Sequence, residues 1–232
     1  IPGNDIYITI DIELQRFVEE TLATQLEQIR ETKISKSTEY YNASGAAAVI
    51  MDIKTGEVLA MVSNPTYDPS VFVGGISTSD WNDLNKPSNR NPLNNRAIMG
   101  FPPGSVFKIA TAYAGLSEEI INNSTTFRCA GTWYGLGNDY PKTCWNKSGH
   151  GGLNILGGLQ NSCDTFFYEL GLRLYLKNKN SDELLQKYCR LFGFGSQTGI
   201  DLPNEETGLI PDKAWKKEWF KNDKANSVWF PG

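Results

Sequence analysis

A helix-breaking tripeptide directly before an apolar helical pattern constrains this chain more than any other feature. Residues Pro102 to Gly104 favour extended backbone and a tight turn, and Ser105 and Lys108 follow three residues apart. This order predicts a helix that begins at Ser105. Because side chains three residues apart in a helix lie on nearly the same face, the hydroxyl and the amine can point into one cleft.

The segment after this turn carries a helical repeat. Apolar side chains recur at steps of three and four residues, at Val106, Ile109, Ala110, Tyr113 and Leu116. The repeat predicts a buried stripe that holds the Ser105 turn rigidly. Backbone N–H groups at the helix start would face a reacting carbonyl, and burial with a neighbouring cation would favour a neutral Lys108 amine. The S-x-x-K tetrapeptide is common by itself, so a second motif has to support it.

Composition narrows the classes of protein. The chain has 232 residues, 40% of them hydrophobic, and 22 basic against 26 acidic side chains, so we expect one large domain over residues 1–232 with a sizeable core. It lacks the basic runs and aromatic platforms of a protein that binds nucleic acid. No apolar stretch has the length of a membrane span, and the chain opens on Ile1 without a signal peptide or an initiator Met. We therefore expect an excised fragment.

Local patterns predict mixed α and β structure. A hairpin is expected from the apolar runs 46–53 and 57–63, after an extended entry at 5–11. The Pro- and Asn-rich segment 64–104 predicts a long ordered loop, and 193–202 a glycine-punctuated turn. An apolar repeat at helical spacing predicts helices over 14–29 and 105–116. Further helices are expected over 153–160, 165–176 and 181–191.

A second polar motif follows Ser105 after 57 residues. Ser162, Cys163 and Asp164 lie between two expected helices and place a hydroxyl near a carboxylate. One interpretation is a proton-relay pair that serves Ser105. The other is an N-cap for the helix that begins at Thr165, because Ser and Asp both suit a helix start.

Together the two motifs resemble the active site of the penicillin-binding proteins, which use S-x-x-K, an S-x-N or S-x-D turn, and K-T-G. The resemblance covers nearly the whole chain and is closest to the class B, elongation-specific type. It implies an α+β fold of the penicillin-binding transpeptidase and serine β-lactamase kind, in which an antiparallel sheet packs with helices beside a helical subdomain. The further matching segments are 5–15, 52–61, 64–69, 95–97, 149–151, 164–168 and 198–202.

This resemblance implies a D,D-transpeptidase that cross-links peptidoglycan stem peptides in cell-wall synthesis and is a target of β-lactams. Ser105 would attack the carbonyl between two D-alanines, Lys108 would take the serine proton, and Ser162 would relay a proton to the leaving amine. Asp164 stands where many relatives carry Asn, so the resemblance does not fix its role.

The resemblance also implies partners and a location. The expected partners are peptidoglycan stem peptides, β-lactam antibiotics and membrane proteins of wall elongation, such as a glycosyltransferase. The expected location is the extracytoplasmic face of the cytoplasmic membrane, with an anchor outside this chain.

The third motif of the family has no suitable counterpart in the sequence. The one Lys-Thr-Gly triplet, residues 54–56, precedes Ser105 and lies in the expected hairpin. In the family this motif lies on a later strand. We therefore expect a domain that is incomplete at the C-terminus, completed by a missing C-terminal segment or a second chain, and inactive alone.

Three of the four cysteines and the single histidine gather in one region. Cys129, Cys144, His150 and Cys163 offer three thiolates and an imidazole, a complete tetrahedral zinc set. A disulfide between Cys129 and Cys144 is the alternative in an extracytoplasmic protein, and a region with neither is also open. The resemblance favours zinc, because some elongation-type relatives hold zinc here. Such zinc would be structural and would tie the Ser162 turn to residues 121–152. Cys189 is expected to be a buried free thiol.

Two other functions stay open at this point. The Pro103–Ile109 run also resembles the motif of class D serine β-lactamases and penicillin sensors. The long 64–104 loop and the Asp164–Tyr168 context favour the transpeptidase. A non-catalytic scaffold of the wall-synthesis complex is the second alternative, and the intact set of reactive side chains weighs against it.

Overall fold

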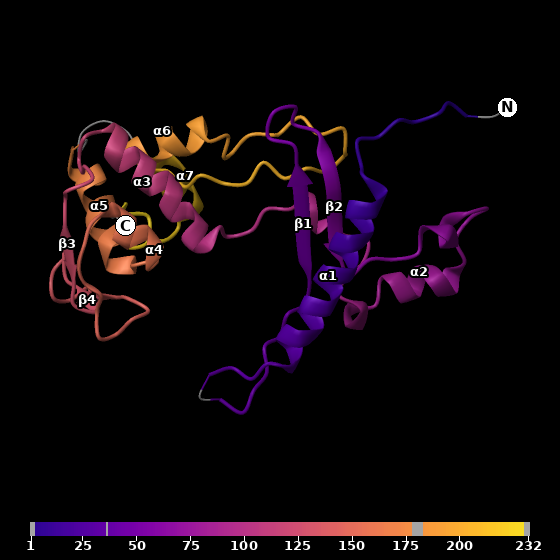
Figure 1. Ribbon diagram of the computed structural model, residues 1–232, viewed down its shortest axis with the longest axis horizontal. Coiled ribbons are helices and arrows are strands. Elements are labelled where there is room, and N and C mark those ends of the chain that lie inside the picture. Colours follow the sequence, from indigo (N-terminus) through magenta and orange to yellow (C-terminus); the bar gives the residue numbers. More distant parts are fainter. Residues whose placement is uncertain (1–2, 36, 178–182, 230–232) are drawn as a thin grey trace. The chain divides into compact units, whose positions relative to one another are not determined.

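The computed structural model describes residues 3–35, 37–177 and 183–229. The chain divides between Met99 and Gly100 into two compact units (Figure 1). Helices and small antiparallel sheets together make the α+β fold that the sequence predicts. Among the described residues, no helix has both the length and the apolar character that crossing a membrane requires.

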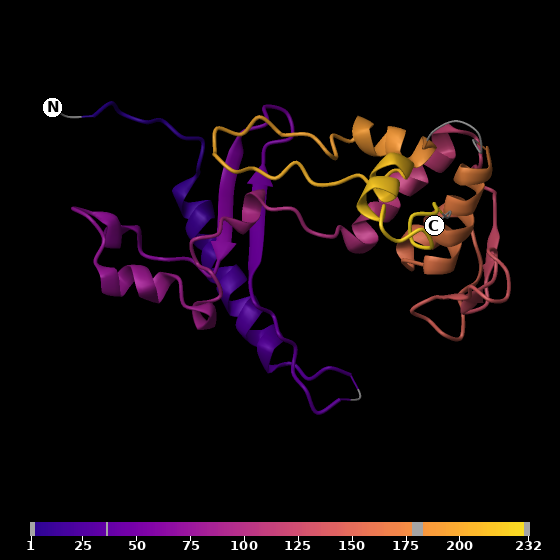
Figure 2. The ribbon, with the colours of Figure 1, turned by 180° about the vertical axis from the view of Figure 1, so that it is seen from behind.

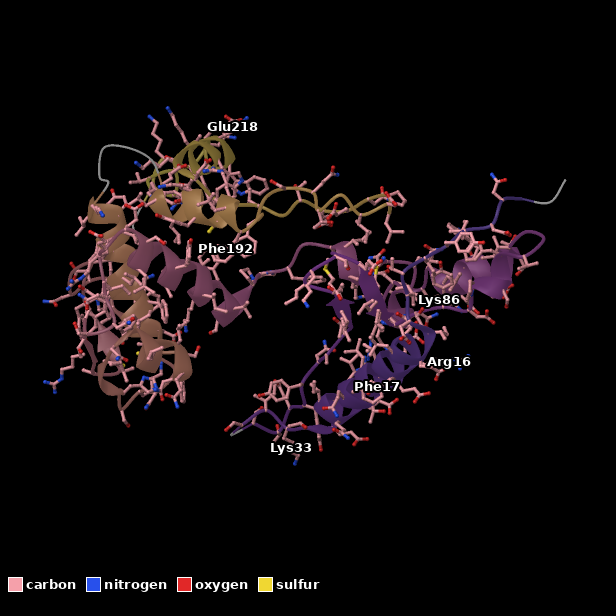
Figure 3. The ribbon with its side chains drawn as sticks, turned by 45° about the horizontal axis from the view of Figure 1, so that its top comes forward. Arg16, Phe17, Lys33, Lys86, Phe192 and Glu218 are labelled. Atoms are coloured by element: carbon pink, nitrogen blue, oxygen red, sulfur yellow. The ribbon has the colours of Figure 1, made fainter. Side chains whose placement is uncertain are left out.

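The N-terminal unit begins its regular structure with a long helix, α1 (Ile12–Glu31). The Asp11 side chain caps it by accepting hydrogen bonds from the backbone N–H groups of Glu13 and Leu14. A carboxylate there satisfies free N–H groups and lies at the positive end of the helix dipole. The predicted helix is confirmed, but Phe17, labelled in Figure 3, is 65% exposed, and Leu26 is the buried residue of α1.

The predicted hairpin is also confirmed. β1 (Ala46–Met51) pairs antiparallel with β2 (Val58–Asn64), and α1 lies along the hairpin (Figure 1). The Gln15 side chain joins the two, donating to the Met61 carbonyl at 2.9 Å and accepting from the Met61 N–H at 2.8 Å. The expected extended entry at 5–11 forms no strand, although Thr9 donates to the Val58 carbonyl.

The segment expected to be one long loop contains a helix that the sequence analysis missed. α2 (Thr78–Leu84) begins after Ser77, whose hydroxyl accepts from the Asp80 N–H and donates to the Asp80 carboxylate. This S-x-x-D start is a capping signal and would have identified the helix. Short 3-10 turns at Pro69–Phe72, Pro87–Asn89 and Arg96–Ile98 add further local structure.

The C-terminal unit is mainly helical. Its helices are α3 (Lys108–Ser117), α4 (Ile155–Gln160), α5 (Asp164–Lys177), α6 (Leu184–Leu191) and α7 (Lys213–Trp219). Its short antiparallel pairs are β3 (Phe127–Cys129) with β6 (Gly151–Leu153), and β4 (Thr132–Trp133) with β5 (Lys142–Thr143). The core lies under α3 and α5, around Phe166 and Leu170. The expected start of the helix at Ser181 lies outside the described residues.

Helix α3 buries a different face from the one that its apolar repeat predicts. Val106 is 70% exposed, Ile109 56% and Tyr113 51%, and of the predicted stripe only Ala110 is buried. The residues that face the core are small: Ala110, Thr111, Ala112, Ala114 and Gly115. A Cβ built on Gly115 would lie 2.7 Å from Leu170 Cδ1, so α3 approaches α5 too closely for large side chains. Packing distance between helices therefore decides the buried face.

After α6 the chain runs out and back as two extended segments before α7 begins (Figure 2). Two carboxylates in this segment accept backbone hydrogen bonds. Glu205 accepts from the Thr198 N–H at 2.9 Å, and Glu206 accepts from the Gly100 N–H at 2.8 Å. The second bond anchors Gly100, five residues before Ser105.

Candidate active site and metal centre

Ser105 lies in a 3-10 turn rather than at the start of an α-helix. The turn covers Gly104–Phe107, and the α-helix begins only at Lys108. Gly104 has a φ of 57°, a left-handed conformation that glycine adopts without steric cost. In a 3-10 turn, side chains three residues apart are nearly eclipsed, so Ser105 and Lys108 still point the same way. Lys108 Nζ lies 3.3 Å from Ser105 Oγ.

Ser162 joins this pair from the turn between α4 and α5. Its hydroxyl donates to Ser105 Oγ at 2.9 Å. Lys108 Nζ donates to both the side-chain and the backbone oxygen of Ser162, at 3.0 and 2.9 Å. Ser162 has a φ of 47°, which a residue with a Cβ rarely adopts. Three groups that can pass a proton are thus in mutual contact.

Asp164, the first residue of α5, completes the arrangement as an ion-pair partner. Its Oδ1 lies 2.6 Å from Lys108 Nζ, and its Oδ2 accepts from the Trp145 N–H at 3.0 Å. Burial by itself raises the pKa of Asp164, but the Lys108 hydrogen bond, the Trp145 N–H and the Lys108 charge outweigh it and lower the pKa. From the sequence we expect a neighbouring cation beside Lys108. The neighbour among the described residues is this carboxylate instead.

The S-x-D turn can serve as a proton-relay pair or as a cap of the following helix. In the described part of the chain, the Ser162 and Asp164 side chains bond to Ser105, Lys108 and Trp145, and neither caps a free N–H of α5. The geometry therefore favours a role beside Ser105 over a simple helix cap.

Two contacts of the site were not found from the sequence. The centroid of the Phe167 ring lies 5.7 Å from Lys108 Nζ, and the Trp145 backbone N–H donates to Asp164. Phe167 follows the S-x-D turn within the same helix, so helical spacing offered a signal for it. A backbone N–H leaves no sequence signal, because every residue except proline has one.

The four predicted metal ligands come together in the C-terminal unit. The ligand atoms of Cys129, Cys144, His150 and Cys163 all lie within 4.8 Å of one another, and the three cysteines are buried. His150 Nδ1 lies 3.6 Å from Cys129 Sγ and 3.7 Å from Cys144 Sγ. Zinc bonds of about 2.3 Å to sulfur and 2.0 Å to nitrogen give a tetrahedral edge of roughly 3.5 Å. The donor set and its spacing therefore fit a metal ion.

Glycines shape the loop that carries the histidine, as the sequence predicts. Gly149 has a φ of 80° and Gly151 a φ of 75°. A Cβ on Gly149 would lie 2.4 Å from the Cys129 carbonyl oxygen, so this close approach requires glycine. His150 Nε2 is buried and has no hydrogen-bond partner among the described residues. The ring is thus held with Nδ1 toward the thiols.

The thiols of the cluster titrate unequally. Burial raises the pKa of Cys129, but hydrogen bonds from Thr165, Gly131 and His150 outweigh it and bring the pKa to about 6. Burial raises the pKa of Cys163 to about 11, and negative charge on Cys129 adds to the effect. The Cys129 thiolate therefore forms readily, and its negative charge opposes ionisation of the Cys163 thiol. A divalent cation among the three sulfurs would supply the charge that full deprotonation requires.

All four cysteines are free thiols in the structure. The alternative disulfide between Cys129 and Cys144 is therefore not formed. Cys189 is buried, as predicted, and burial raises the pKa of its thiol.

Residues 46–227 match the family model of the penicillin binding protein transpeptidase domain. The chain is 37% identical over 231 residues to peptidoglycan D,D-transpeptidase MrdA of Escherichia coli (strain K12), covering 99% of this chain and 32% of that relative. The chain thus spans about a third of the length of this curated relative.

Solved structures give the same result. The crystal structure of Pseudomonas aeruginosa PBP2 in complex with WCK 5153 is similar with a TM-score of 0.78 and 32% identity, over 100% of this chain and 46% of that one. PBP2 in its complex with MreC from Helicobacter pylori is similar with a TM-score of 0.73 and 33% identity, over 94% of this chain and 37% of that one.

Proposed function

Because this chain belongs to the penicillin-binding protein transpeptidase family, we propose that it carries the acylation groups of a peptidoglycan D,D-transpeptidase. Residues 1–232 then form part of one transpeptidase domain of the elongation-specific type. The observation that carries the proposal is the contact of Lys108 Nζ with both hydroxyls, of Ser105 and of Ser162, which are themselves hydrogen-bonded.

The contacts support a definite division of roles. Ser105 Oγ attacks the carbonyl between the last two D-alanines of a stem peptide, and a neutral Lys108 amine takes the serine proton. The Ser105 ester forms as the bond to the terminal D-alanine breaks. Ser162, within 3.0 Å of Lys108, passes the proton to the leaving amine. An amine from a second strand then takes the acyl group.

Asp164 acts by holding Lys108 in place. Asp164 is the anionic partner of Lys108 Nζ, whereas Ser105 and Ser162 contact the same atom through neutral oxygens. A relative with Asn at this position would keep a hydrogen bond to Lys108 without the charge. The carboxylate therefore adds an electrostatic restraint on the lysine.

Zinc is the proposed occupant of the cysteine and histidine cluster. Cys129, Cys144, His150 and Cys163 would hold it, and with four protein ligands a tetrahedral site keeps no position for water. Zinc there supplies structural cross-linking and charge, and no group on the metal is needed for acyl transfer. Because Cys163 lies between Ser162 and Asp164, the cluster fixes the turn that carries both.

The proposal extends to partners and location. A solved relative forms a complex with MreC, which supports protein partners for this family member as well. We place the domain on the extracytoplasmic face of the cytoplasmic membrane, where its stem-peptide substrate is, with β-lactams as inhibitors and a wall-elongation glycosyltransferase as a partner. The Lys54–Gly56 triplet is assigned no part in catalysis, because it precedes Ser105 in the sequence, whereas the K-T-G motif of the family lies on a later strand.

A fluorescent penicillin tests the proposal in the intact protein that carries this chain. We expect a long-lived covalent adduct, and peptide mass spectrometry should locate it on Ser105. Ser105→Ala should abolish labelling while the protein stays folded. Labelling that persists in this variant would identify a different nucleophile, rapid loss of the label would favour a β-lactamase, and no labelling of the folded wild type would favour a scaffold.

A further inference from the structure

We propose that Trp145 is a positioning residue that holds the Ser162 turn in its acylation geometry. The inference rests on the proposed function. Trp145 donates two hydrogen bonds to this turn: its backbone N–H to Asp164 Oδ2 and its indole Nε1–H to the Asn161 carbonyl, each at 3.0 Å. The two acceptors flank Ser162 on both sides. One residue therefore clamps both ends of a four-residue turn.

The turn needs an external restraint. Ser162 has a left-handed φ of 47°, a conformation that is disfavoured for residues other than glycine and persists only where surrounding contacts enforce it. Asn161 is the C-cap of α4, and carbonyl groups at a helix C-terminus lack partners within the helix. The Trp145 indole supplies a partner for that carbonyl. This hydrogen bond thus pairs the free carbonyl at the end of α4 and also fixes the start of the turn.

Trp145 is also joined to the cysteine and histidine cluster. It directly follows Cys144, and its ring lies edge-on to the His150 ring with centroids 5.2 Å apart. Besides Cys163, which lies within the turn itself, Trp145 thus links the cluster to Lys108 through Asp164.

The exposure of Trp145 separates this role from core packing. The side chain is 63% exposed, so its removal opens no buried cavity. A large aromatic side chain that is this exposed contributes little to the core, and its one side-chain hydrogen bond, from the indole to the Asn161 carbonyl, gives it a positioning role. The effect of losing the indole donor should therefore appear in the reaction and not in the stability of the fold.

Trp145→Phe tests the clamp in the intact protein, because it keeps an aromatic ring and the backbone N–H but removes the indole donor. We expect the first-order acylation rate constant for a fluorescent penicillin to fall about 3- to 10-fold, the effect of one lost hydrogen bond. The dissociation constant of the pre-covalent complex and the melting temperature should stay at the wild-type values. Trp219→Phe, on an exposed indole of α7, is the matched control and should change none of these.

A second measurement follows the turn itself. Hydrogen exchange of the peptide that contains residues 161–164 should be faster in Trp145→Phe, and exchange in α3 should not change. Equal acylation rates and equal exchange in the variant and the wild type would overturn the proposal, as would a general loss of folded protein in the variant. If the folded wild type is not acylated at all, the proposed function fails, while the exchange measurement still tests the clamp.

Discussion

The hydroxyl of Ser162 donates a 2.9 Å hydrogen bond to the hydroxyl of Ser105, although 57 residues separate them in the chain. One residue lies in the 3-10 turn before α3 and the other in the turn before α5. Lys108 Nζ bonds to both. Once Lys108 has lost a proton, its neutral amine lies within reach of both hydroxyls and can accept from either.

Ser162→Ala should slow acylation without preventing it. We expect a rate lower by about 10²- to 10⁴-fold, the usual contribution of a positioned proton-transfer group. The measurement is the acylation rate with a fluorescent penicillin, and Ser148→Ala, at an exposed serine, serves as the control. A wild-type rate in Ser162→Ala would remove Ser162 from the relay.

Asp164→Ala should destabilise the C-terminal unit, because it leaves the Lys108 ammonium, whose side chain is 13% exposed, without its anionic partner. A hydrogen bond to a charged group contributes about 1.5–3 kcal/mol, so the free energy of unfolding should fall by about that amount. Asp164→Asn should cost less, since its amide oxygen still accepts from Lys108 or Trp145. Urea denaturation measures both variants, and equal losses would show that the negative charge beside Lys108, and not the shape or the accepting oxygen of the side chain, stabilises the site.

Cys144→Ser should lower the zinc content of the purified protein from one ion per chain towards zero, since it removes one of four ligands. Elemental analysis measures the content, and Cys189→Ala is the control because that buried thiol lies outside the cluster. Unchanged zinc in Cys144→Ser would remove Cys144 from the ligand set. Chelation of the metal should also lower the melting temperature of the wild type.

The carboxylate of Glu118 should make stability depend on acid pH. The hydrogen bond from the Tyr188 hydroxyl, at 2.7 Å, is the largest influence on the pKa of Glu118; burial raises the pKa, and Lys187 and Lys177 add to the lowering. Because the folded-state pKa lies below the unfolded value of about 4.3, the stabilisation is complete above that value and is lost as pH falls through the folded pKa.

Urea denaturation from pH 7 to pH 3 checks this expectation. The difference in unfolding free energy between the wild type and Glu118→Gln should shrink as pH falls below about 4.3. Tyr188→Phe removes the largest cause of the lowered Glu118 pKa but leaves both lysines in place. The unfolding free energy of this variant should therefore change less between pH 7 and pH 3 than that of the wild type. A difference that is constant over the whole range would contradict the assignment.

Gly115→Ala should destabilise the packing of α3 on α5. The new Cβ would lie 2.7 Å from Leu170 Cδ1, and overpacking of this kind costs about 1–3 kcal/mol. Gly171→Ala is the matched control, because its Cβ would meet no atom within 4 Å and the change should gain up to about 1 kcal/mol from helix propensity. Thermal unfolding of both variants decides whether close approach explains the small residues of α3.

Features that depend on neighbours along the chain could be predicted from the sequence. The alignment of Ser105 with Lys108, the helix α1 and the β1–β2 hairpin follow from local spacing, and the structure contains all three. The gathering of three cysteines and a histidine also followed, since these residue types share one chemistry. The helix and the hairpin depend on residues close together in the sequence, and the cluster depends on residue types that all bind metals.

Tertiary structure decided the rest. An apolar repeat does not tell which face a second helix will approach, and close contact with Leu170 selected the small side chains of α3 over Ile109 and Tyr113. The ion pair of Lys108 with Asp164 and the two hydrogen bonds from Trp145 join residues 16 to 56 positions apart. The sequence by itself determined which reactive groups the chain has, because spacing and residue type are local properties. Only the packing of α3 against α5 decided which of them meet, because distances across the fold depend on how closely those helices pack.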